Sequence, residues 1–336
     1  MNRKIILVQR PQGLPKDEDF KLIEEPLNTA LEIGEVLVKV EWISIDPAQR
    51  VWIGAGRSYI TPVSVGSVVK GMGAGIVVFS KSPAFKRGSF VTGFLHWQEY
   101  AKVKASDIIR LPSYVNPQLH LGVLGMTGLT AYVAVNEIAK PRKKETMVVS
   151  TAAGAVGSIA CQLGKIRGCR VIGISGSDAK NRWLTEIGVD GVINYKTVPN
   201  LTQALKSLCP EGIDIYIDLV GGDILDAVLL NIKKYARIVM CGAISSYNLK
   251  RAPPIRYYPL IISQSASVEG FIVWEHRNKF DIAVKNLSKW IKENKIKHKE
   301  HIVDGIENAP RALRMVMTGE NFGKMVVRVE HQSPKI

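Results

Sequence analysis

From Thr146 onward, short apolar runs alternate with longer segments whose apolar residues recur at helical spacing. This alternation limits the fold more than any other feature of the chain, because apolar strands separated by amphipathic helices are typical of a parallel sheet covered on both faces. The expected strands are 146–151, 170–175, 191–195, 213–220, 236–243 and 268–273. The expected helices are a first one ending near Gly168 and further ones over 178–188, 200–209, 223–234 and 279–295. We therefore predict an α/β unit with a doubly wound parallel sheet.

The turn after the first of these strands has the sequence AAGAVGS, residues 152–158. It follows the dinucleotide-binding pattern G-x-G-x-x-G except that Ala152 stands at the first glycine position, with Gly154 and Gly157 at the other two. Glycine at 154 lets a pyrophosphate approach the backbone, and glycine at 157 lets the helix pack closely on the strand. Ala152 is compatible with the turn if its φ is negative. The flanking strand and helix favour a Rossmann dinucleotide site over the alternative, a tight turn that binds nothing.

The end of the second strand indicates which dinucleotide is bound. In an NAD site, an acidic residue about 20 residues beyond the turn accepts a hydrogen bond from the ribose 2′-hydroxyl. Here the segment 173–180 offers the small donor Ser175 and, in the first turn of the next helix, Lys180. Asp178 is its one carboxylate, and we interpret it as the cap of that helix. The pattern favours NADP(H), with a 2′-phosphate beside Lys180; the alternative for Lys180 is a solvated surface lysine.

The first 125 residues lack the strand–helix alternation. Their short apolar runs are broken by Gly and Pro, and they predict an irregular antiparallel or barrel-like β-domain. A helix over 122–139 is expected to end before Pro141. The segment 306–330 predicts a helix, a turn and a strand that could return to this domain. The strands expected in the first domain are 36–44, 75–80, 89–94 and 108–112.

The cysteines and histidines exclude several classes of protein. The four cysteines, at positions 161, 169, 209 and 241, form no C-x-x-C pair, which indicates reduced thiols in a cytoplasmic protein. No group of His, Cys and acidic residues has the spacing of zinc ligands, so we expect no metal site. No apolar run approaches the roughly 18 residues of a membrane-spanning helix. The N-terminal run IILV predicts a strand; the alternative is a mitochondrial leader, since the first acidic residue is Asp17.

The formal net charge of +15 is high, with basic clusters at 140–144 and 292–301. We interpret these clusters as a solvated basic surface, and attraction of a phosphorylated cofactor or of nucleic acid is the alternative. Neither cluster is interleaved with aromatic residues that could stack on bases, so no specific nucleic-acid partner is expected.

Several motifs together identify a family: ISIDPAQR (43–50), GMGAGIVV (71–78), GMTGLTAY (125–132), AAGAVGS (152–158), SGSDAK (175–180), NYKT (194–197), MCGAISSYN (240–248), GFIV (270–273) and ENFGK (320–324). On these motifs the chain resembles, over nearly its whole length, the medium-chain dehydrogenase/reductase superfamily. Within it the chain is similar to the zinc-free prostaglandin reductase / leukotriene B4 12-hydroxydehydrogenase group, which includes NADP-dependent alkenal double-bond reductases.

The resemblance implies two domains and a reaction. A GroES-like β-barrel catalytic domain is expected at 1–125, rejoined by 305–336, with a Rossmann NADP-binding domain at 126–304. The implied reaction is NADPH-dependent, zinc-independent reduction of the C=C bond of an α,β-unsaturated aldehyde or ketone. The family also suggests a homodimer.

The resemblance further assigns residues to the cofactor. Lys180 is implied at the 2′-phosphate and Tyr195 near the adenosine end. The residues implied at the pyrophosphate are Gly154, Ala155, Val156 and Gly157. The residues implied on the nicotinamide side are Cys241, Gly242, Ala243, Ile244, Ser245, Ser246, Tyr247, Phe271, Ile272 and Val273. Asn321 is also implied to meet the cofactor.

Tyr247 is the candidate catalytic residue. The resemblance places it at the enolate oxygen or at the nicotinamide ribose 2′-hydroxyl. Hydride addition to the β-carbon of an enone builds negative charge on the carbonyl oxygen, and a phenol O–H directed at that oxygen would stabilise the charge. The alternative is that the ring of Tyr247 only packs on the cofactor.

The sequence departs from the family pattern at two positions. Leu219 stands where the family usually has Asn, and His96 stands where relatives tend to have Gly. Leu219 cannot supply the polar contact of an amide, while His96 could narrow the cleft or place a titrating ring near it. The segment 249–260, just after Tyr247, is basic and aromatic, so the acceptor could be anionic or aromatic.

Two other functions remain as hypotheses. A quinone reductase on the same fold would use the same site, since quinones also accept hydride at a conjugated system. A nucleotide-sensitive RNA-binding or non-catalytic protein is the alternative from another class, favoured by the charge and opposed by the lack of aromatic–basic interleaving.

Overall fold

The computed structural model describes residues 1–56, 58–112 and 116–330, so the last six residues of the expected C-terminal tail lie outside the described part. The chain divides into two compact units. The first unit comprises residues 1–122 and 300–336, and the second comprises residues 123–299.

The second unit is built on a six-stranded sheet in which all neighbouring strands are parallel. Its strands are β8 (Thr146–Val149), β9 (Arg170–Ser175), β10 (Gly191–Asn194), β11 (Ile213–Asp218), β12 (Ile232–Met240) and β13 (Ser267–Gly270). Their order is β10-β9-β8-β11-β12-β13. The chain moves outward from β8 to β10 and then returns to β11 on the other side of β8, so the topological switch point lies between β8 and β11. The predicted doubly wound α/β sheet is confirmed.

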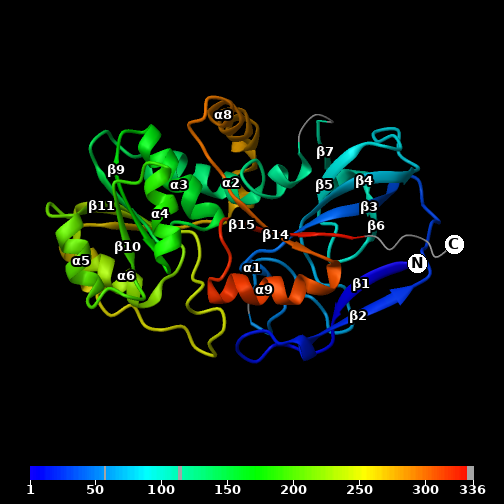
Figure 1. The fold of residues 1–336 in the computed structure, drawn as a ribbon, viewed down its shortest axis with the longest axis horizontal. Helices are drawn as coiled ribbons and strands as arrows, with labels where there is room; N and C mark the ends of the chain where they lie inside the picture. The colour runs from blue at the N-terminus through cyan, green and yellow to red at the C-terminus, as the bar shows by residue number, and fades with distance from the viewer. Residues whose placement is uncertain (57, 113–115, 331–336) are drawn as a thin grey trace. The chain divides into compact units, whose positions relative to one another are not determined.

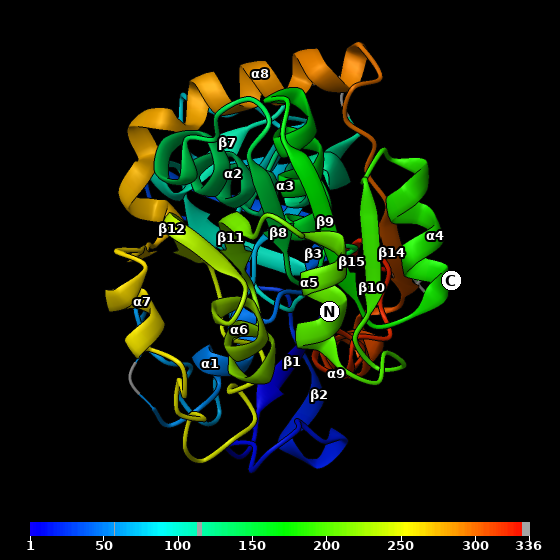
Figure 2. The same ribbon diagram turned by 90° about the vertical axis from the view of Figure 1, so that its left-hand side faces the viewer.

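Helices cover both faces of this sheet. Figure 2 shows α2 (Met126–Tyr132), α3 (Ala155–Ile166) and α8 (Phe280–Lys292) on one side and α5 (Leu201–Leu208) and α6 (Gly222–Leu229) on the other. The other helices of the unit are α4 (Asp178–Glu186), α7 (Pro259–Ser263) and a 3-10 helix over Val273–Lys279. A π-helical segment, Val133–Ala139, continues α2 and is capped at Lys140, so the helix ends before Pro141 as expected.

The largest boundary difference in this unit lies between α6 and β12. The helix expected over 223–234 ends at Leu229, and β12 already begins at Ile232. The N–H of Ile213 donates to the carbonyl of Asn231 (2.9 Å), so pairing with β11 draws this segment into the sheet. Sheet hydrogen bonds outweigh a helical apolar pattern at this position.

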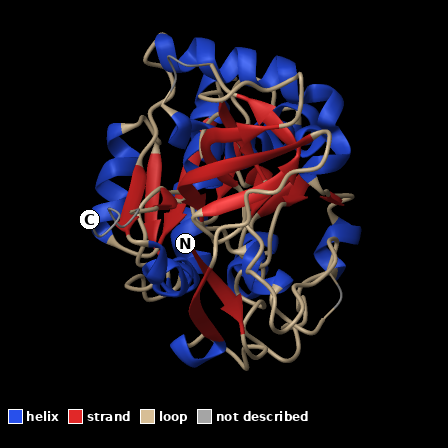
Figure 3. Cartoon of the chain, turned by 90° about the vertical axis from the view of Figure 1, so that its right-hand side faces the viewer, coloured by secondary structure: helices blue, strands red, loops and turns tan. Residues whose placement is uncertain are grey.

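The first unit is β-rich. Its main sheet has the order β14-β15-β3-β4-β5-β7, with β6 paired to β3, and only β14 and β15 run parallel. A separate antiparallel ribbon is formed by β1 (Asn2–Leu7), the expected N-terminal strand, and β2 (Phe20–Glu25) (Figure 3). The strands of the main sheet are β3 (Glu35–Ser44), β4 (Gly73–Ser80), β5 (Phe90–Gly93), β6 (Tyr100–Lys104), β7 (Ile108–Arg110), β14 (Glu300–Asp304) and β15 (Lys324–Arg328). The helices are α1 (Ala48–Trp52), α9 (Ala309–Thr318) and 3-10 turns at Asp17–Asp19, Ala105–Asp107, Pro117–Leu121 and Ile306–Asn308.

The C-terminal segment completes the first unit. The red strand β15 lies against the blue strand β3 in Figure 1 and pairs with it antiparallel. Leu313 of α9 and Val327 of β15 are fully buried in the same core as Val36 and Ile43 of β3. Because β14 pairs with β15, residues 300–304 lie in the sheet of the first unit, although the resemblance placed them at the end of the second domain.

Candidate functional site

The residues assigned to the cofactor in the second unit are distant in sequence but follow the carboxyl ends of parallel strands. The glycine turn follows β8, the SGSDAK segment follows β9, and Tyr195 follows β10. The segment 241–247 follows β12, and 271–273 follows β13. Because the carboxyl ends of parallel strands meet at one edge of a sheet, these segments share the edge at which open α/β sheets bind ligands.

The left-handed residue in the glycine turn is Thr151, not Ala152. Thr151 has φ 47°, whereas Ala152 is not among the residues with positive φ. A Cβ at Gly157 would lie 2.3 Å from the Thr151 carbonyl oxygen, and a Cβ at Gly154 would lie 2.9 Å from Thr151 Cγ2. The turn therefore needs the second and third glycines of the pattern and tolerates alanine at the first.

The N-terminus of α3 suits a phosphate group. Gly154 is its N-cap and provides no side-chain cap, and the first turn carries no acidic residue. The first N–H groups of a helix have no partner within the helix and form the positive end of its dipole. Here they belong to Ala155, Val156 and Gly157, so the structure offers backbone donors where the sequence predicts pyrophosphate.

Near the end of β9, the charge of one lysine lowers the pKa of another. Burial lowers the pKa of Lys180, and the positive charge of Lys196 lowers it further. A Cβ on Gly176 would lie 3.2 Å from the Tyr195 ring and 3.3 Å from Lys196 Cε, so both side chains pack over this glycine. An anion between two such ammonium groups would relieve their repulsion. Sequence reasoning missed Lys196, although it lies within the NYKT motif.

The helix cap at this position was predicted one residue too late. Ser177 is the N-cap of α4, and its Oγ accepts a hydrogen bond from a backbone N–H of the first turn (3.3 Å). Asp178 instead accepts a hydrogen bond from Asn194 Nδ2 (2.8 Å). The Ser175 hydroxyl is buried and donates to Asn181 Oδ1 (2.7 Å). Both polar side chains are therefore engaged within the protein.

The phenol of Tyr247 contacts its own loop. The N–H of Ala243 donates to the Tyr247 hydroxyl oxygen (3.1 Å), and a Cβ on Gly242 would lie 3.3 Å from that oxygen. Burial raises the pKa of Tyr247, and the hydrogen bond from Ala243 opposes this rise. A hydroxyl that accepts one hydrogen bond still has its own O–H to donate. The end of β12 thus presents a neutral donor.

The rest of the segment after β12 is fixed by its own polar groups. The Ser245 N–H donates to the Val220 carbonyl (3.2 Å), and its hydroxyl donates to the same oxygen (2.6 Å). The Ser246 hydroxyl donates to the carbonyl of Ala243 (2.8 Å). These two serines, assigned to the cofactor, use their hydroxyls to hold the loop.

Sequence reasoning missed Asp218, the last residue of β11. It is fully buried, and one carboxylate oxygen accepts hydrogen bonds from the N–H groups of Val220 (2.9 Å) and Gly221 (2.8 Å) and from the Tyr216 hydroxyl (2.9 Å). Its carbonyl accepts a hydrogen bond from the Cys241 N–H (2.8 Å). Burial raises the pKa of Asp218, and these hydrogen bonds to the carboxylate oppose the rise. A single acid at the carboxyl end of an apolar strand was the signal that could have identified it.

At the end of β13, Phe271, Ile272 and Val273 lead into the 3-10 helix. The Phe271 ring meets the His276 ring edge-on, with 5.8 Å between centroids. All three residues are half-buried.

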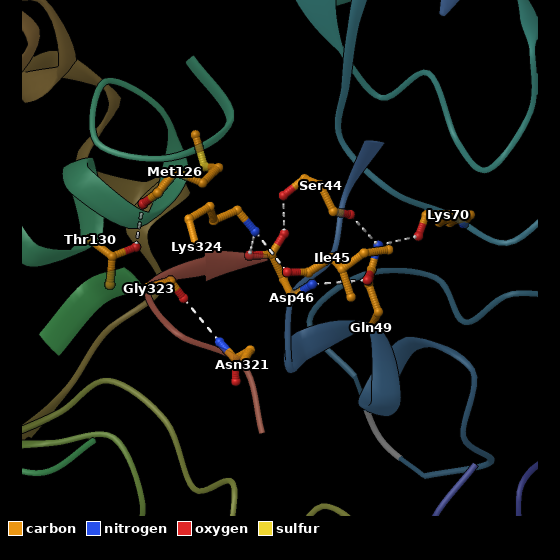
Figure 4. A network of polar contacts seen from close by, with 10 residues as sticks. All are labelled: Ser44, Ile45, Asp46, Gln49, Lys70, Met126, Thr130, Asn321, Gly323 and Lys324. Carbon is orange, nitrogen blue, oxygen red and sulfur yellow. Dashed lines mark hydrogen bonds and ion pairs between the residues drawn. The ribbon is translucent and has the colours of Figure 1, made fainter. Parts of the chain in front are cut away.

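In the first unit, Asn321 lies in the turn before β15. Its side-chain amide donates to the Gly323 carbonyl (2.9 Å) (Figure 4). The ammonium of the buried Lys324 donates to the carbonyl of Ile45 and to the carboxylate of Asp46, at 2.7 Å each. This ion pair connects the ENFGK and ISIDPAQR motifs and anchors the turn that carries Asn321.

The departure at Leu219 affects the side chain but not the backbone contacts. The Leu219 N–H donates to Ser150 Oγ (2.8 Å), and its carbonyl accepts from the N–H of Ile244 (3.4 Å). The backbone at 219 therefore joins the ends of β8, β11 and β12 whatever side chain it carries.

The departure at His96 places a buried imidazole on a strained backbone. His96 has φ 64°, a conformation that glycine adopts without strain, and its Nδ1 is buried without a hydrogen-bond partner in the described part of the unit. Burial, and then the charge of Lys70, lower the pKa of His96 to about 4. Its ring is therefore neutral at pH 7.

Within residues 1–56, 58–112 and 116–330, no group of three or more His, Cys, Asp or Glu is arranged to hold a metal ion. No helix in the same residues has the length and apolar character needed to cross a membrane.

The chain is similar to known oxidoreductases over nearly its whole length. A family described as the N-terminal domain of oxidoreductase matches residues 3–111, and one described as zinc-binding dehydrogenase matches residues 155–289. NADPH-dependent curcumin reductase of Escherichia coli is 38% identical over 98% of this chain and 97% of its own. Prostaglandin reductase 1 of Bos taurus is 37% identical over 94% of this chain and 95% of its own. The crystal structure of CurA in complex with NADPH from Vibrio vulnificus is 34% identical and covers 98% of this chain and 100% of that one, with a TM-score of 0.92.

Proposed function

This chain belongs to the zinc-free, NADP-dependent reductases of the medium-chain dehydrogenase/reductase superfamily, and we propose that it reduces the C=C bond of α,β-unsaturated aldehydes and ketones with NADPH. The observation that carries this proposal is the Tyr247 hydroxyl, whose oxygen accepts from the Ala243 N–H and whose own proton is left to donate. We assign the first unit as the GroES-like domain, which the family names catalytic, and the second, which carries Tyr247, as the NADP-binding domain.

The residues at the carboxyl edge of the parallel sheet fit the cofactor. The N–H groups at the start of α3 would hold the pyrophosphate, and Lys180 with Lys196 would hold the 2′-phosphate. Tyr195 would lie at the adenosine end, while 241–247 and 271–273 would hold the nicotinamide side. When bound, the reduced nicotinamide supplies a hydride.

Tyr247 would act on the acceptor through its O–H. Negative charge develops on the carbonyl oxygen of the acceptor, and a hydrogen bond to a neutral phenol stabilises that charge as it forms. The Ala243 N–H would in turn stabilise negative charge on the phenol oxygen, so the same hydroxyl can transfer its proton. A second role, a contact with the nicotinamide ribose 2′-hydroxyl, is compatible with the same donor.

The proposal is tested by NADPH consumption with an alkenal, a cyclic enone, curcumin and a quinone, with NADH in parallel. We expect turnover with the enal and enone, a product saturated at the C=C bond by mass spectrometry, and a clear preference for NADPH. Turnover of the quinone alone would indicate a quinone reductase instead. Equal rates with NADH and NADPH would contradict the assignment of Lys180 to the 2′-phosphate.

We also infer a cytoplasmic homodimer. Strand β13 lies at the edge of the sheet with all four of its residues exposed, and Tyr235, Ile262 and Val268 are exposed large hydrophobic side chains nearby in the fold. An unprotected edge of this kind can pair with the same edge of a second copy. The four free cysteines suit a reducing compartment. Light scattering on the wild type and on Val268→Lys tests the dimer, and a wild type that is monomeric at micromolar concentration would contradict it.

A further inference from the structure

Two features of His96 in the first unit each cost free energy. Its φ of 64° lies in the left-handed region, and its Nδ1 is buried without a hydrogen-bond partner among the residues that the structure describes. Glycine would adopt the same φ without strain and would bring no polar atom into the site. Residues held in strained conformations cluster where proteins bind or react, so His96 is a candidate for a functional role.

The backbone around His96 is firmly held. The His96 N–H donates to the Gly71 carbonyl (2.9 Å), and the His96 carbonyl accepts from the Gln98 N–H (3.1 Å). The neighbours Leu95 and Trp97 have no exposed surface. The chain therefore cannot relax the left-handed residue without breaking these bonds or moving buried side chains, and the imidazole is fixed where it lies.

The His96 ring belongs to a row of four aromatic rings. It lies 6.3 Å from the Phe94 ring, which lies 6.1 Å from the Trp52 ring, measured between centroids. Tyr59 meets Trp52 edge-on at 6.3 Å and is 48% exposed, so the row extends from the buried side of the unit to its surface. Rings at these distances attract one another, and a further aromatic ring from a ligand would find the same kind of contact.

A second polar atom of this row is also buried without a partner. Trp52 is 6% exposed, and its Nε1 has no hydrogen-bond partner in the described part of the chain. The Trp52 and His96 rings both pack on Phe94. Aromatic walls with a few polar atoms left to pair are typical of small-molecule sites. This row therefore has the composition of a ligand site.

The two nitrogens indicate the chemistry of the ligand. An indole N–H only donates, so Trp52 requires an oxygen that accepts. The His96 ring is neutral at pH 7, and its Nδ1 either donates or accepts, depending on the tautomer. A hydroxyl group can pair with Nδ1 in both tautomers, because it carries one donor and two acceptor lone pairs. An aromatic ring with a hydroxyl group satisfies the packing and the polar requirements together.

We propose that His96 is a specificity-determining residue for acceptors that carry a hydroxylated aromatic ring: the ring packs against Phe94 and Trp52, and its hydroxyl forms a hydrogen bond with His96 Nδ1. This inference rests on the proposed function, because it names a subclass of the enones that are reduced with NADPH. It concerns recognition of the acceptor and gives His96 no part in hydride or proton transfer.

The main test compares two enones that differ by one group, benzylideneacetone and its para-hydroxy derivative, in wild type and His96→Gly. The measured quantity is the ratio of kcat/KM for the hydroxylated enone to kcat/KM for the other. The electronic effect of the hydroxyl cancels when the two proteins are compared. We expect this ratio to fall about tenfold in His96→Gly, through KM rather than kcat, since one hydrogen bond to substrate is lost. An unchanged ratio would overturn the proposal.

A matched pair of variants separates the hydrogen bond from the packing of the ring. His96→Phe keeps an aromatic ring but removes the nitrogen, so the ratio should fall as in His96→Gly. His120→Phe is the control: His120 also has a buried nitrogen without a partner among the described residues, but its φ is not positive. It should keep the wild-type ratio. A wild-type ratio in His96→Phe, or an equal fall in His120→Phe, would overturn the proposal.

Product inhibition of the wild type covers the case in which the variants do not fold. The saturated ketone formed from the hydroxylated enone should inhibit about tenfold more strongly than the ketone formed from benzylideneacetone. Equal inhibition by the two ketones would refute the role of His96. Failure of the wild type to reduce any enal or enone would instead refute the proposed function, so the two failures are distinguishable.

Discussion

Along the carboxyl edge of the parallel sheet, the region after β8 and β9 and the region after β11 and β12 use different chemistry. After β8 and β9, helix N–H groups and two lysines are the groups that we propose to bind the phosphates of the cofactor. After β11 and β12, the polar side chains form hydrogen bonds with the backbone of the segments that follow these two strands, as Asp218, Ser245 and Ser246 do. The Tyr247 hydroxyl accepts one such bond and has its own O–H to donate.

The difference predicts how each region responds to substitution. Substitution of a side chain that contacts a ligand on its own should weaken binding of that ligand and change protein stability little. Groups bonded into a buried network should affect stability and catalysis together, because removing one leaves its partners unsatisfied. The four variants below test this contrast.

The largest effect is expected for Gly157→Ala. The new Cβ would lie 2.3 Å from the Thr151 carbonyl oxygen and 2.9 Å from the backbone of Ala152, so the turn or α3 must shift. We expect the free energy of unfolding to fall by about 3 kcal/mol and NADPH binding to be lost. Gly270→Ala is the control, because a Cβ there meets nothing within 4 Å. Denaturant unfolding and NADPH titration measure both, and a Gly157→Ala variant that binds NADPH normally would refute this account of the turn.

Tyr247→Phe should lower kcat for enone reduction about 100-fold, the usual size for loss of one donor to a developing oxyanion. Because the Ala243 N–H loses its acceptor, stability should fall by about 1 kcal/mol as well. Tyr257→Phe, at a partly exposed tyrosine nearby in sequence, is the control and should change neither quantity. Steady-state kinetics with NADPH measure this effect. A kcat within twofold of wild type would mean that the Tyr247 hydroxyl is not catalytic and that the ring only packs on the cofactor.

Lys180→Met should weaken NADPH binding about 10-fold to 100-fold, since an ion pair with a phosphate contributes about 1.5–3 kcal/mol. NADH binding should hardly change, and stability should be unaffected or slightly higher because burial disfavours this ammonium. Lys206→Met, at an exposed position on α5, is the matched control. Equal losses of NADPH and NADH affinity would contradict a contact with the 2′-phosphate.

The two regions also differ in how far the sequence predicts them. Periodicity predicts the order of strands and helices, and the spacing of Gly154 and Gly157 predicts the phosphate end, because a tight strand–turn–helix must have small residues at fixed places. The ends of the strands were predicted less well. The expected strands 213–220, 236–243 and 268–273 stop at Asp218, Met240 and Gly270, because the chain stays apolar after it leaves the sheet.

Most of the residues beyond these strand ends lie in segments that we propose to hold the cofactor, and this explains what the sequence could not supply. The contacts of Ser150, Asp218 and Cys241 join residues that lie far apart in sequence, and they depend on strand order, which no local pattern contains. The same holds for Lys324 and Asp46 in the first unit. Tyr247 itself was assigned through the family resemblance, and the partner of its hydroxyl became visible only in the fold.

The smallest effect is expected for Leu219→Asn, which restores the residue usual in the family. The backbone of residue 219 already bonds to Ser150 and Ile244, so the amide adds no contact that the loop needs. We expect stability to change by less than about 0.5 kcal/mol and the Kd for NADPH by less than about threefold. Leu219→Ala controls for loss of the apolar side chain, and calorimetric titration measures both variants. A tenfold gain in NADPH affinity for Leu219→Asn, but not for Leu219→Ala, would mean that a single side chain after β11 contacts the cofactor. The proposed difference between the two regions would then be wrong.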